Sequence, residues 1–177
     1  MTASTFDREI NLRDGTRLHV RPIRPDDEPR LVDLYARLSQ DTRYQRFFGV
    51  MQRLPPDWAH FLANVDHKRR FALVVEHPSD QALIAVGRYE SSGDDPGVAE
   101  LAVVVQDGWQ GRGIGSVLMG GLLRAAASHG ITRFRAYVLG QNRRMLDLLR
   151  RYTDVVEQST DRGVVDLLLT AKAQLTG

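Results

Sequence analysis

Cysteine is absent from this chain of 177 residues, and lysine is scarce. Without cysteine there can be no disulfide, no thiolate metal site and no cysteine-acyl intermediate, so an acyl transfer must be direct or use another nucleophile. No apolar run approaches the roughly 18 residues that span a bilayer, and the polar start of the chain lacks signal-peptide character. We therefore expect a soluble, cytoplasmic protein without a membrane partner.

The chain also lacks a large excess of charge of either sign, because 24 basic residues nearly balance the acids and leave a net charge of +2. Only two of the basic residues, Lys68 and Lys172, are lysines. The basic residues are scattered among acids, unlike the stripe of a nucleic-acid-binding protein. The histidines lack metal-ligand spacing. Neither nucleic acid nor metal is therefore expected. The length and the 42% hydrophobic content suit one core and predict a single domain over residues 1–177. The five histidines are His19, His60, His67, His77 and His129.

Alternating glycines mark the segment 108–116, which reads GWQGRGIGS. It lies between an expected strand, Ala99–Val105, and an expected helix, Ser116–His129. A helix N-terminus offers free N–H groups and a favourable dipole to an anion, and glycine allows close approach. The spacing matches neither the dinucleotide fingerprint G-x-G-x-x-G nor a nucleotide P-loop. The pattern that remains is Q-x-x-G-x-G, which predicts a phosphate cradle; a helix-capping loop without ligand is the alternative.

The periodicity of the chain predicts a mixed α/β order. A hairpin turns at Asp14-Gly15, and a second closes the chain at 161–163. Helices are expected from the acids at 26–28, near 39–49, and after Pro55, where Trp58, Phe61, Leu62 and Val65 share a face. An antiparallel meander precedes the glycine turn, and the strand after the turn should run parallel to Ala99–Val105. The remaining expected elements are the strands Ile10–Leu12, Arg17–Val20, Phe71–Glu76, Leu83–Tyr89 and Phe134–Leu139 and the helix Asn142–Tyr152.

The glycine turn, the valines before it and Asn142 after it resemble, in this order, the landmarks of the GNAT superfamily of N-acetyltransferases. Upstream, the stretches 12–16, 20–28 and 38–49 are similar to the acetyltransferase domain of Pat-type protein lysine acetyltransferases. The resemblance covers about the whole chain. It implies the GNAT fold, a single mixed, mostly antiparallel sheet with splayed central parallel strands, flanked by helices. Control by the cyclic-nucleotide-binding domain found in some relatives is not carried over.

The resemblance also implies a set of residues that bind acetyl-CoA. The strand Val103, Val104 and Val105 would pair with pantetheine, although the same valines could simply be buried. Backbone N–H groups of the turn would hold the pyrophosphate, with Arg112 adding a charge or lying in solvent. Asn142 would contact CoA, cap the last helix, or do both. The turn residues assigned to the cofactor are Gln110, Gly111, Arg112, Gly113, Ile114, Gly115 and Ser116.

Glu100 is the predicted general base. Strand alternation places it on one face with Ala102 and Val104, and partial burial would raise its pKa toward neutrality. Pat-like sequences resemble this one in carrying a glutamate there. A solvated residue at the start of a strand is the alternative reading, and Glu90 is the reserve candidate.

Two further features concern the other half of the reaction. Many GNAT enzymes have a tyrosine acid where this chain has Leu149, and Tyr152 fits the core better than that role. The stretch Arg43–Phe48 is either a wall of the acceptor site or ordinary helix packing.

The sequence thus predicts an acetyl-CoA-dependent N-acetyltransferase that modifies protein lysines by direct transfer, assisted by Glu100. One alternative is an enzyme that acetylates a small amine, such as a polyamine, antibiotic or amino acid. Another is an acyl-CoA-binding sensor without turnover. A homodimer is compatible with all three.

Overall fold

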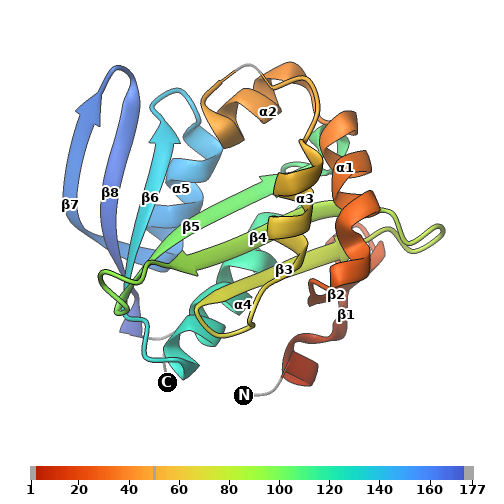
Figure 1. The fold of residues 1–177 in the computed structure, drawn as a ribbon, viewed down its shortest axis with the longest axis horizontal. Coiled ribbons are helices and arrows are strands. Elements are labelled where there is room, and N and C mark those ends of the chain that lie inside the picture. Colours follow the sequence, from red (N-terminus) through yellow and green to blue (C-terminus); the bar gives the residue numbers. More distant parts are fainter. Residues whose placement is uncertain (1–2, 50, 174–177) are drawn as a thin grey trace.

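The computed structural model describes residues 3–49 and 51–173, which form one eight-stranded sheet with helices on both faces (Figure 1). The strand order is β1-β2-β3-β4-β5-β6-β8-β7. Neighbours are antiparallel except for β5 and β6, which run parallel. The predicted mixed sheet with one central parallel pair is thereby confirmed. The strands are β1 (Arg8–Asn11), β2 (Arg17–Pro22), β3 (Arg70–Glu76), β4 (Leu83–Ser91), β5 (Val98–Val105), β6 (Arg133–Leu139), β7 (Thr153–Asp161) and β8 (Val164–Ala171).

Two hydrophobic clusters lie on opposite faces of this sheet. On one face, α1 and α3 cover side chains of β3 to β5, including Val74, Val86 and Val104. On the other, α4 and α5 cover alternate residues of the same strands, including Leu73 and Leu101. The helices are α1 (Glu28–Arg37), α2 (Gln40–Phe47), α3 (Pro56–Ala63), α4 (Ile114–Ser128) and α5 (Arg143–Tyr152), with short 3₁₀ turns η1 (Ala3–Phe6), η2 (Pro25–Asp27) and η3 (Asp107–Trp109).

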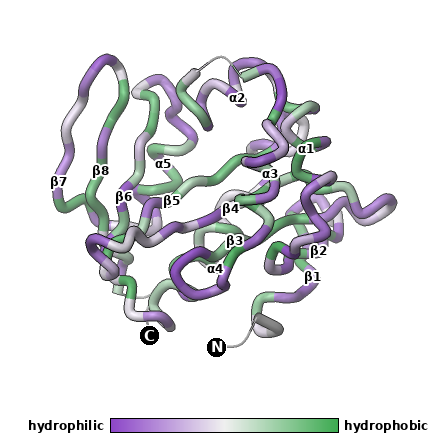
Figure 2. The backbone as a smooth tube through the Cα atoms, in the orientation of Figure 1, coloured by the Kyte–Doolittle hydropathy of each residue, from purple (hydrophilic) through white to green (hydrophobic). Residues whose placement is uncertain are grey.

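The edge strand β7 and the central strands of the sheet differ in polarity (Figure 2). Nearly every residue of the edge strand β7 after Thr153 is exposed, and charged side chains recur along it, which discourages pairing with another chain. The central strands β3 and β4 are almost fully buried. The site described below thus lies beside the buried centre of the sheet.

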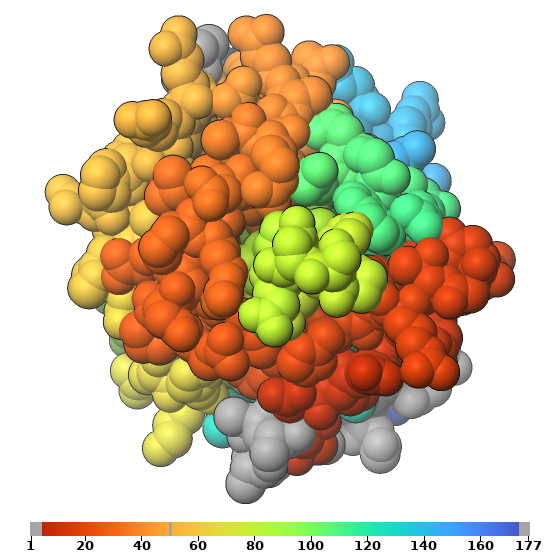
Figure 3. Space-filling model, turned by 90° about the vertical axis from the view of Figure 1, so that its right-hand side faces the viewer, coloured from red at the N-terminus to blue at the C-terminus, as the bar shows by residue number. Residues whose placement is uncertain are grey.

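Segments far apart in sequence meet on the face shown in Figure 3, where α1 and α2, the loop between β3 and β4, the glycine turn and the β1–β2 hairpin lie side by side. The Asp107 carboxylate accepts from the Ser39 hydroxyl at 2.7 Å and from the Thr42 hydroxyl at 2.8 Å. His77 and Trp109 make an edge-to-face contact with ring centroids 5.5 Å apart. The glycine turn is thus held in place by α2 and by the β3–β4 loop.

The structure adds detail to three local expectations. The central helix begins at Ile114, two residues before the predicted start, because Gly113 already acts as its N-cap. Asp27, one of the acids at the predicted helix start, is fully buried and receives 2.8 Å hydrogen bonds from both terminal nitrogens of Arg21. Only part of the predicted apolar face of α3 enters the core: Leu62 is buried, whereas Trp58 and Phe61 stay about half exposed.

Candidate active site

The glycine turn connects β5 to α4 and presents unpaired backbone amides. Gly111 and Gly113 have φ values of 74° and 96°, in the left-handed region that favours glycine. Gly113 is the N-cap of α4, and no side chain in the described part of the chain caps this helix. Successive N–H groups with such dihedrals, at the positive end of a helix dipole, form an anion-binding concavity. The geometry therefore fits a phosphate group.

Side chains brace this turn from both sides. The Gln110 amide donates through Nε2 to the Val105 carbonyl at 2.9 Å, and its Oε1 accepts from Arg144 Nη1 at 2.9 Å. Arg112 does not extend into solvent: it is half-buried, forms an ion pair with Asp14 and lies over the Trp109 ring at 4.3 Å. Arg144, which the sequence analysis overlooked, is thus a cation beside the turn.

Asn142 has the capping role that was one of its two readings. Its Oδ1 accepts a hydrogen bond of 3.3 Å from the Met145 N–H, and Asn142 is the N-cap of α5. Contact with CoA stays a prediction for this residue.

The parallel strands β5 and β6 separate soon after they meet. Their pairing covers Val98 to Glu100 on β5 and Arg133 to Arg135 on β6, whereas β4 pairs with β5 as far as Val105. The second half of β5 therefore has one open edge, toward β6 (Figure 1). The Gln106 N–H donates to the Ile84 carbonyl, so the peptide groups of Gln106 point toward β4. In an antiparallel ladder this direction alternates from residue to residue. The peptide groups of Val104 therefore also point toward β4, whereas those of Leu101 and Val103 point toward the open edge.

A pocket of about 470 Å³ lies on the α1–α3 side of β4 and β5. Glu100 and Ala102 line it together, as the strand alternation predicts. Two other walls of the pocket come from segments that are separate in the sequence. Part of the stretch 43–48, at the end of α2, forms one wall, and the half-exposed aromatic residues of α3 form the other. The lining residues are Arg46, Phe47, Phe48, Trp58, Phe61, Leu62, Arg88, Glu90, Glu100 and Ala102.

The environment of Glu100 suits a proton acceptor. The described residues give it no hydrogen bond or ion pair, and desolvation by surrounding protein raises its pKa above the ordinary glutamate range. The nearby Arg46 opposes this shift of the pKa, and the charge of Glu90 adds to it. Glu100 remains exposed on its pocket side, so a ligand can reach it. A carboxylate whose pKa approaches neutrality is a more effective base at physiological pH.

A tyrosine acid is indeed missing from α5. Leu149 has no exposed surface, and Tyr152 is half-buried and packs against the same core cluster. Among the described residues, no group of three or more histidine, cysteine or acidic side chains is placed to hold a metal ion. Within the described chain, no helix is both long and apolar enough to cross a bilayer.

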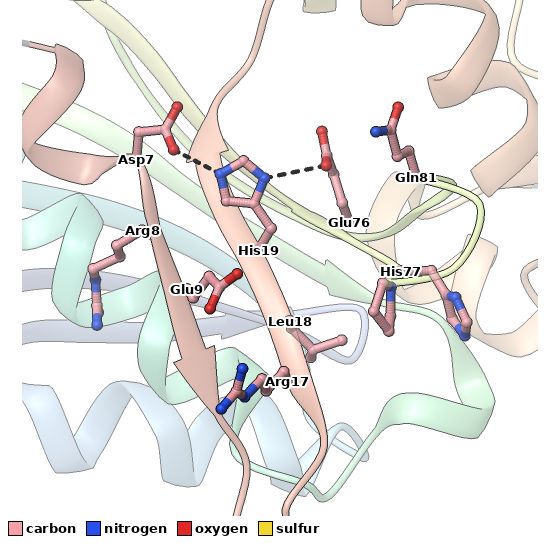
Figure 4. Close-up of a pocket in the computed structure, with 10 residues that line it drawn as sticks. Asp7, Arg8, Glu9, Arg17, Leu18, His19, Glu76, His77 and Gln81 are labelled. Atoms are coloured by element: carbon pink, nitrogen blue, oxygen red, sulfur yellow. Dashed lines mark hydrogen bonds and ion pairs between the residues drawn. The ribbon is translucent and has the colours of Figure 1, made fainter.

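A second hollow, of about 480 Å³, lies away from Glu100, over β1, β2 and the end of β3. Figure 4 shows His19 there, between the carboxylates of Asp7 and Glu76. The His19 ring nitrogens lie 2.6 Å from Asp7 Oδ1 and 3.2 Å from Glu76 Oε2. The hydrogen bond to Asp7 is the main cause that raises the pKa of His19. Glu76 also pairs with the buried Arg21, so this cluster ties the N-terminal hairpin to the sheet.

Comparisons with known proteins agree with this geometry. A family model described as "Acetyltransferase (GNAT) domain" matches residues 17–152. The acetyltransferase Pat of Mycolicibacterium smegmatis is 35% identical over 158 residues, which are 88% of this chain and 46% of that protein. An acetyltransferase of Pseudomonas aeruginosa is 33% identical over 140 residues, or 78% of this chain and 75% of that protein. The chain thus spans about half the length of the mycobacterial relative.

Solved structures lead to the same family. The GNAT domain of Streptomyces lividans PAT superposes with a TM-score of 0.86 at 31% identity, covering 96% of this chain and 99% of that one. A cAMP-binding acyltransferase from Mycobacterium smegmatis gives a TM-score of 0.65 at 28% identity, covering 97% of this chain and 50% of that one. With its splayed strands, its glycine turn and these relatives, the chain belongs to the GNAT family of acetyltransferases.

Proposed function

We propose that this enzyme transfers the acetyl group of acetyl-CoA directly to lysine side chains of proteins, with Glu100 as the general base. GNAT acetyltransferases use acetyl-CoA as their donor. The observation that carries the proposal is the arrangement of β5: its open edge lies between the glycine turn at the N-terminus of α4 and a pocket that contains a carboxylate. A donor thioester and an acceptor amine could meet along this strand.

The donor side would use mainly the backbone. Pantetheine would add to the open edge of β5 like a short strand and pair with the peptide groups of Leu101 and Val103. N–H groups of the glycine turn, from Gly111 to Ser116, would bind the pyrophosphate. N–H groups on the open edge can also donate to the thioester carbonyl, which gains negative charge in the transition state.

The acceptor side supports a long, apolar side chain that ends in a cation. The aromatic rings of Phe47, Phe48, Trp58 and Phe61 would surround methylene groups, and the carboxylates lie at the sheet end of the pocket. Trp58 and Phe61 are about half exposed, as aromatic residues often are at protein interaction sites. These features favour a lysine presented by a protein over a small polar amine. The resemblance of the sequence to Pat-type protein lysine acetyltransferases also supports this acceptor.

The proposed chemistry needs one base and no acid from the protein. Glu100 would take a proton from the lysine ammonium, directly or through water, and the freed amine would attack the thioester carbon. As the carbon–nitrogen bond forms and the carbon–sulfur bond breaks, the CoA thiolate leaves. With a pKa near 8.5 for a thiol, that thiolate can accept the second proton that the nitrogen loses. The absence of a tyrosine at Leu149 is compatible with this sequence of steps.

The proposal is tested by incubating a cell lysate with acetyl-CoA and either the natural enzyme or Glu100→Gln, followed by mass spectrometry of acetylated lysines. We expect specific protein lysines to be acetylated by the natural enzyme only. A parallel assay of CoA thiol release offers polyamines, amino acids and lysine peptides. If CoA thiol were released with small amines only, the acceptor would be a metabolite and not a protein lysine. Acetyl-CoA binding without release for any acceptor would indicate a sensor.

A further inference from the structure

Two carboxylates face each other across the strands that carry the proposed base. Glu90 on β4 is the register partner of Glu100 on β5, and both line the acceptor pocket. The Cα atoms of such a hydrogen-bonded pair lie about 5.5 Å apart, with both side chains on the same face. Like charges directly opposite each other destabilise a sheet. The described chain places no cation in ion-pair contact with Glu100, so this pair has room for a cationic ligand.

The surroundings of the two carboxylates differ. Glu90 Oε1 lies 3.5 Å from Arg70 Nη2 and 3.9 Å from Arg88 Nη1. Glu90 therefore has two arginine partners, whereas Glu100 has no such partner among the described residues. Two carboxylates that share a site but have different neighbours can serve different roles in one reaction.

Arg88 is the unusual group of this pocket. It is 3% exposed, and its Nε and Nη2 have no hydrogen-bond partner. Burial is the main cause that lowers the pKa of this guanidinium to about 10. An unpaired buried charge is costly, and Glu90 is the only carboxylate that the described chain places in ion-pair contact with Arg88. Glu90 is therefore the side chain that offsets the buried charge of Arg88.

The same arginines join Glu90 to the aromatic wall. Arg88 Nη1 donates to the Leu62 carbonyl at 3.2 Å, and Arg70 Nη2 donates to the Phe61 carbonyl at 2.6 Å. Both acceptors are among the last carbonyls of α3, which have no partner within the helix. The Arg70 guanidinium also lies 3.6 Å from the centroid of the Phe61 ring. The carboxylate and the aromatic face of α3 are therefore held as one unit.

We propose that Glu90 binds the ammonium of the acceptor, beside the Glu100 base, and that Arg88 is the residue that positions Glu90. The inference rests on the proposed acetyl transfer and adds a second substrate-binding carboxylate to it. The lysine enters the pocket as its ammonium and lies between the two carboxylates. Glu90 holds the ammonium in place, while Glu100 receives one proton from it. The neutral amine then forms the carbon–nitrogen bond as described above.

The test compares a cationic acceptor with a neutral one. A lysine peptide is an ammonium at about pH 8, whereas hydroxylamine is neutral there and needs no ammonium-binding carboxylate. For Glu90→Gln we expect the KM of the lysine peptide to rise roughly tenfold, the scale of one lost charge-assisted hydrogen bond, while kcat changes less than about threefold. The KM change for hydroxylamine should be at least about fivefold smaller.

Controls separate binding from structural damage. Glu90→Asp keeps the charge and should recover most of the affinity for the peptide. Glu90→Gln leaves the charge of Arg88 unpaired, which can prevent folding. In that case the double variant Glu90→Gln/Arg88→Met removes both charges and should show the same larger rise in KM for the lysine peptide than for hydroxylamine. The Kd of acetyl-CoA checks the fold of each variant.

Three outcomes decide the inference. A larger rise in KM for the lysine peptide than for hydroxylamine supports it. Equal losses for both acceptors, or an unchanged KM for the lysine peptide, would overturn it. If the natural enzyme released no thiol with either acceptor, the proposed function itself would fail.

Discussion

Arg112 in the glycine turn donates through Nε to the Asp14 carboxylate at 3.2 Å, although the two residues are 98 positions apart. Asp14 lies at the tip of the β1–β2 hairpin, where hydrogen bonds from Thr16 and Arg112 lower its pKa to about 2. The positive charge of Arg112 is therefore already satisfied within the protein. A pyrophosphate bound at this turn would depend on backbone amides more than on this arginine.

The first prediction contrasts two neighbouring substitutions in the turn. Gly113→Ala forces a side chain into a left-handed conformation at φ 96°, which costs about 1–2 kcal/mol and disturbs the amides. We expect it to weaken CoA binding roughly tenfold, whereas Arg112→Ala weakens it less than about threefold. Calorimetric titration with CoA measures both. A larger loss for Arg112→Ala would assign the phosphate to the side chain instead.

Arg144 is the cation that we expect to assist the turn. A Cβ added at Gly111 would lie 3.6 Å from Arg144 Nη2, so the guanidinium is adjacent to the predicted phosphate site. Arg144→Ala should weaken CoA binding several-fold, with a larger effect at low salt because the side chain is exposed. Arg150→Ala, on the same helix, is the matched control and should leave the Kd unchanged. Equal Kd values for both variants would show that Arg144 does not contact the ligand.

A third prediction concerns the packing of α4 on the sheet. An added Cβ at Gly121 would lie 2.6 Å from the Leu73 side chain, but at Gly120 it would meet the flexible end of Arg124 at 3.3 Å. Overpacking should make Gly121→Ala less stable by about 1–3 kcal/mol. Gly120→Ala should be neutral or up to about 1 kcal/mol more stable, as alanine favours helix. Urea denaturation distinguishes them, and equal stability of the two variants would contradict this packing.

His19 should make stability depend on pH. Its pKa is raised, chiefly by the hydrogen bond to Asp7, so its contribution is complete below the ordinary histidine pKa of about 6.5 and is lost as pH rises through the folded-state value. The difference in unfolding free energy between the natural protein and His19→Asn should therefore shrink as the pH rises above about 6.5, the ordinary histidine pKa. A difference that stays constant or grows would show that His19 is not charged in this cluster.

Much of the fold could be predicted from the sequence because its signals are local. The hairpin at Asp14-Gly15, the glycine turn and the alternation of β5 each follow from a few adjacent residues, and the order of elements then limits the topology. Helix boundaries were less certain. The start of α4 at Ile114 depends on the dihedrals of Gly113, which the residue type permits but does not specify.

The acceptor pocket could not be assembled in the same way. Trp58, Phe61 and Leu62 have helical spacing that resembles a core face, and their sequence does not reveal that α3 turns this face toward a pocket. Arg88 carried a signal that was missed, since an arginine inside the apolar strand β4 demands a partner. The proximity of Glu90 and Glu100 depends on strand register, which is a tertiary property.

The central claim is that Glu100 removes the proton from the acceptor, and the pH dependence of acetyl transfer to a lysine peptide tests it most directly. Because the pKa of Glu100 is raised, the rate of the natural enzyme should increase with pH through a limb above the ordinary glutamate range. Glu100→Gln should bind acetyl-CoA normally, react about 10²–10⁴-fold more slowly and lack that limb. A variant that kept the same profile at a rate within about threefold of the natural enzyme would contradict the account.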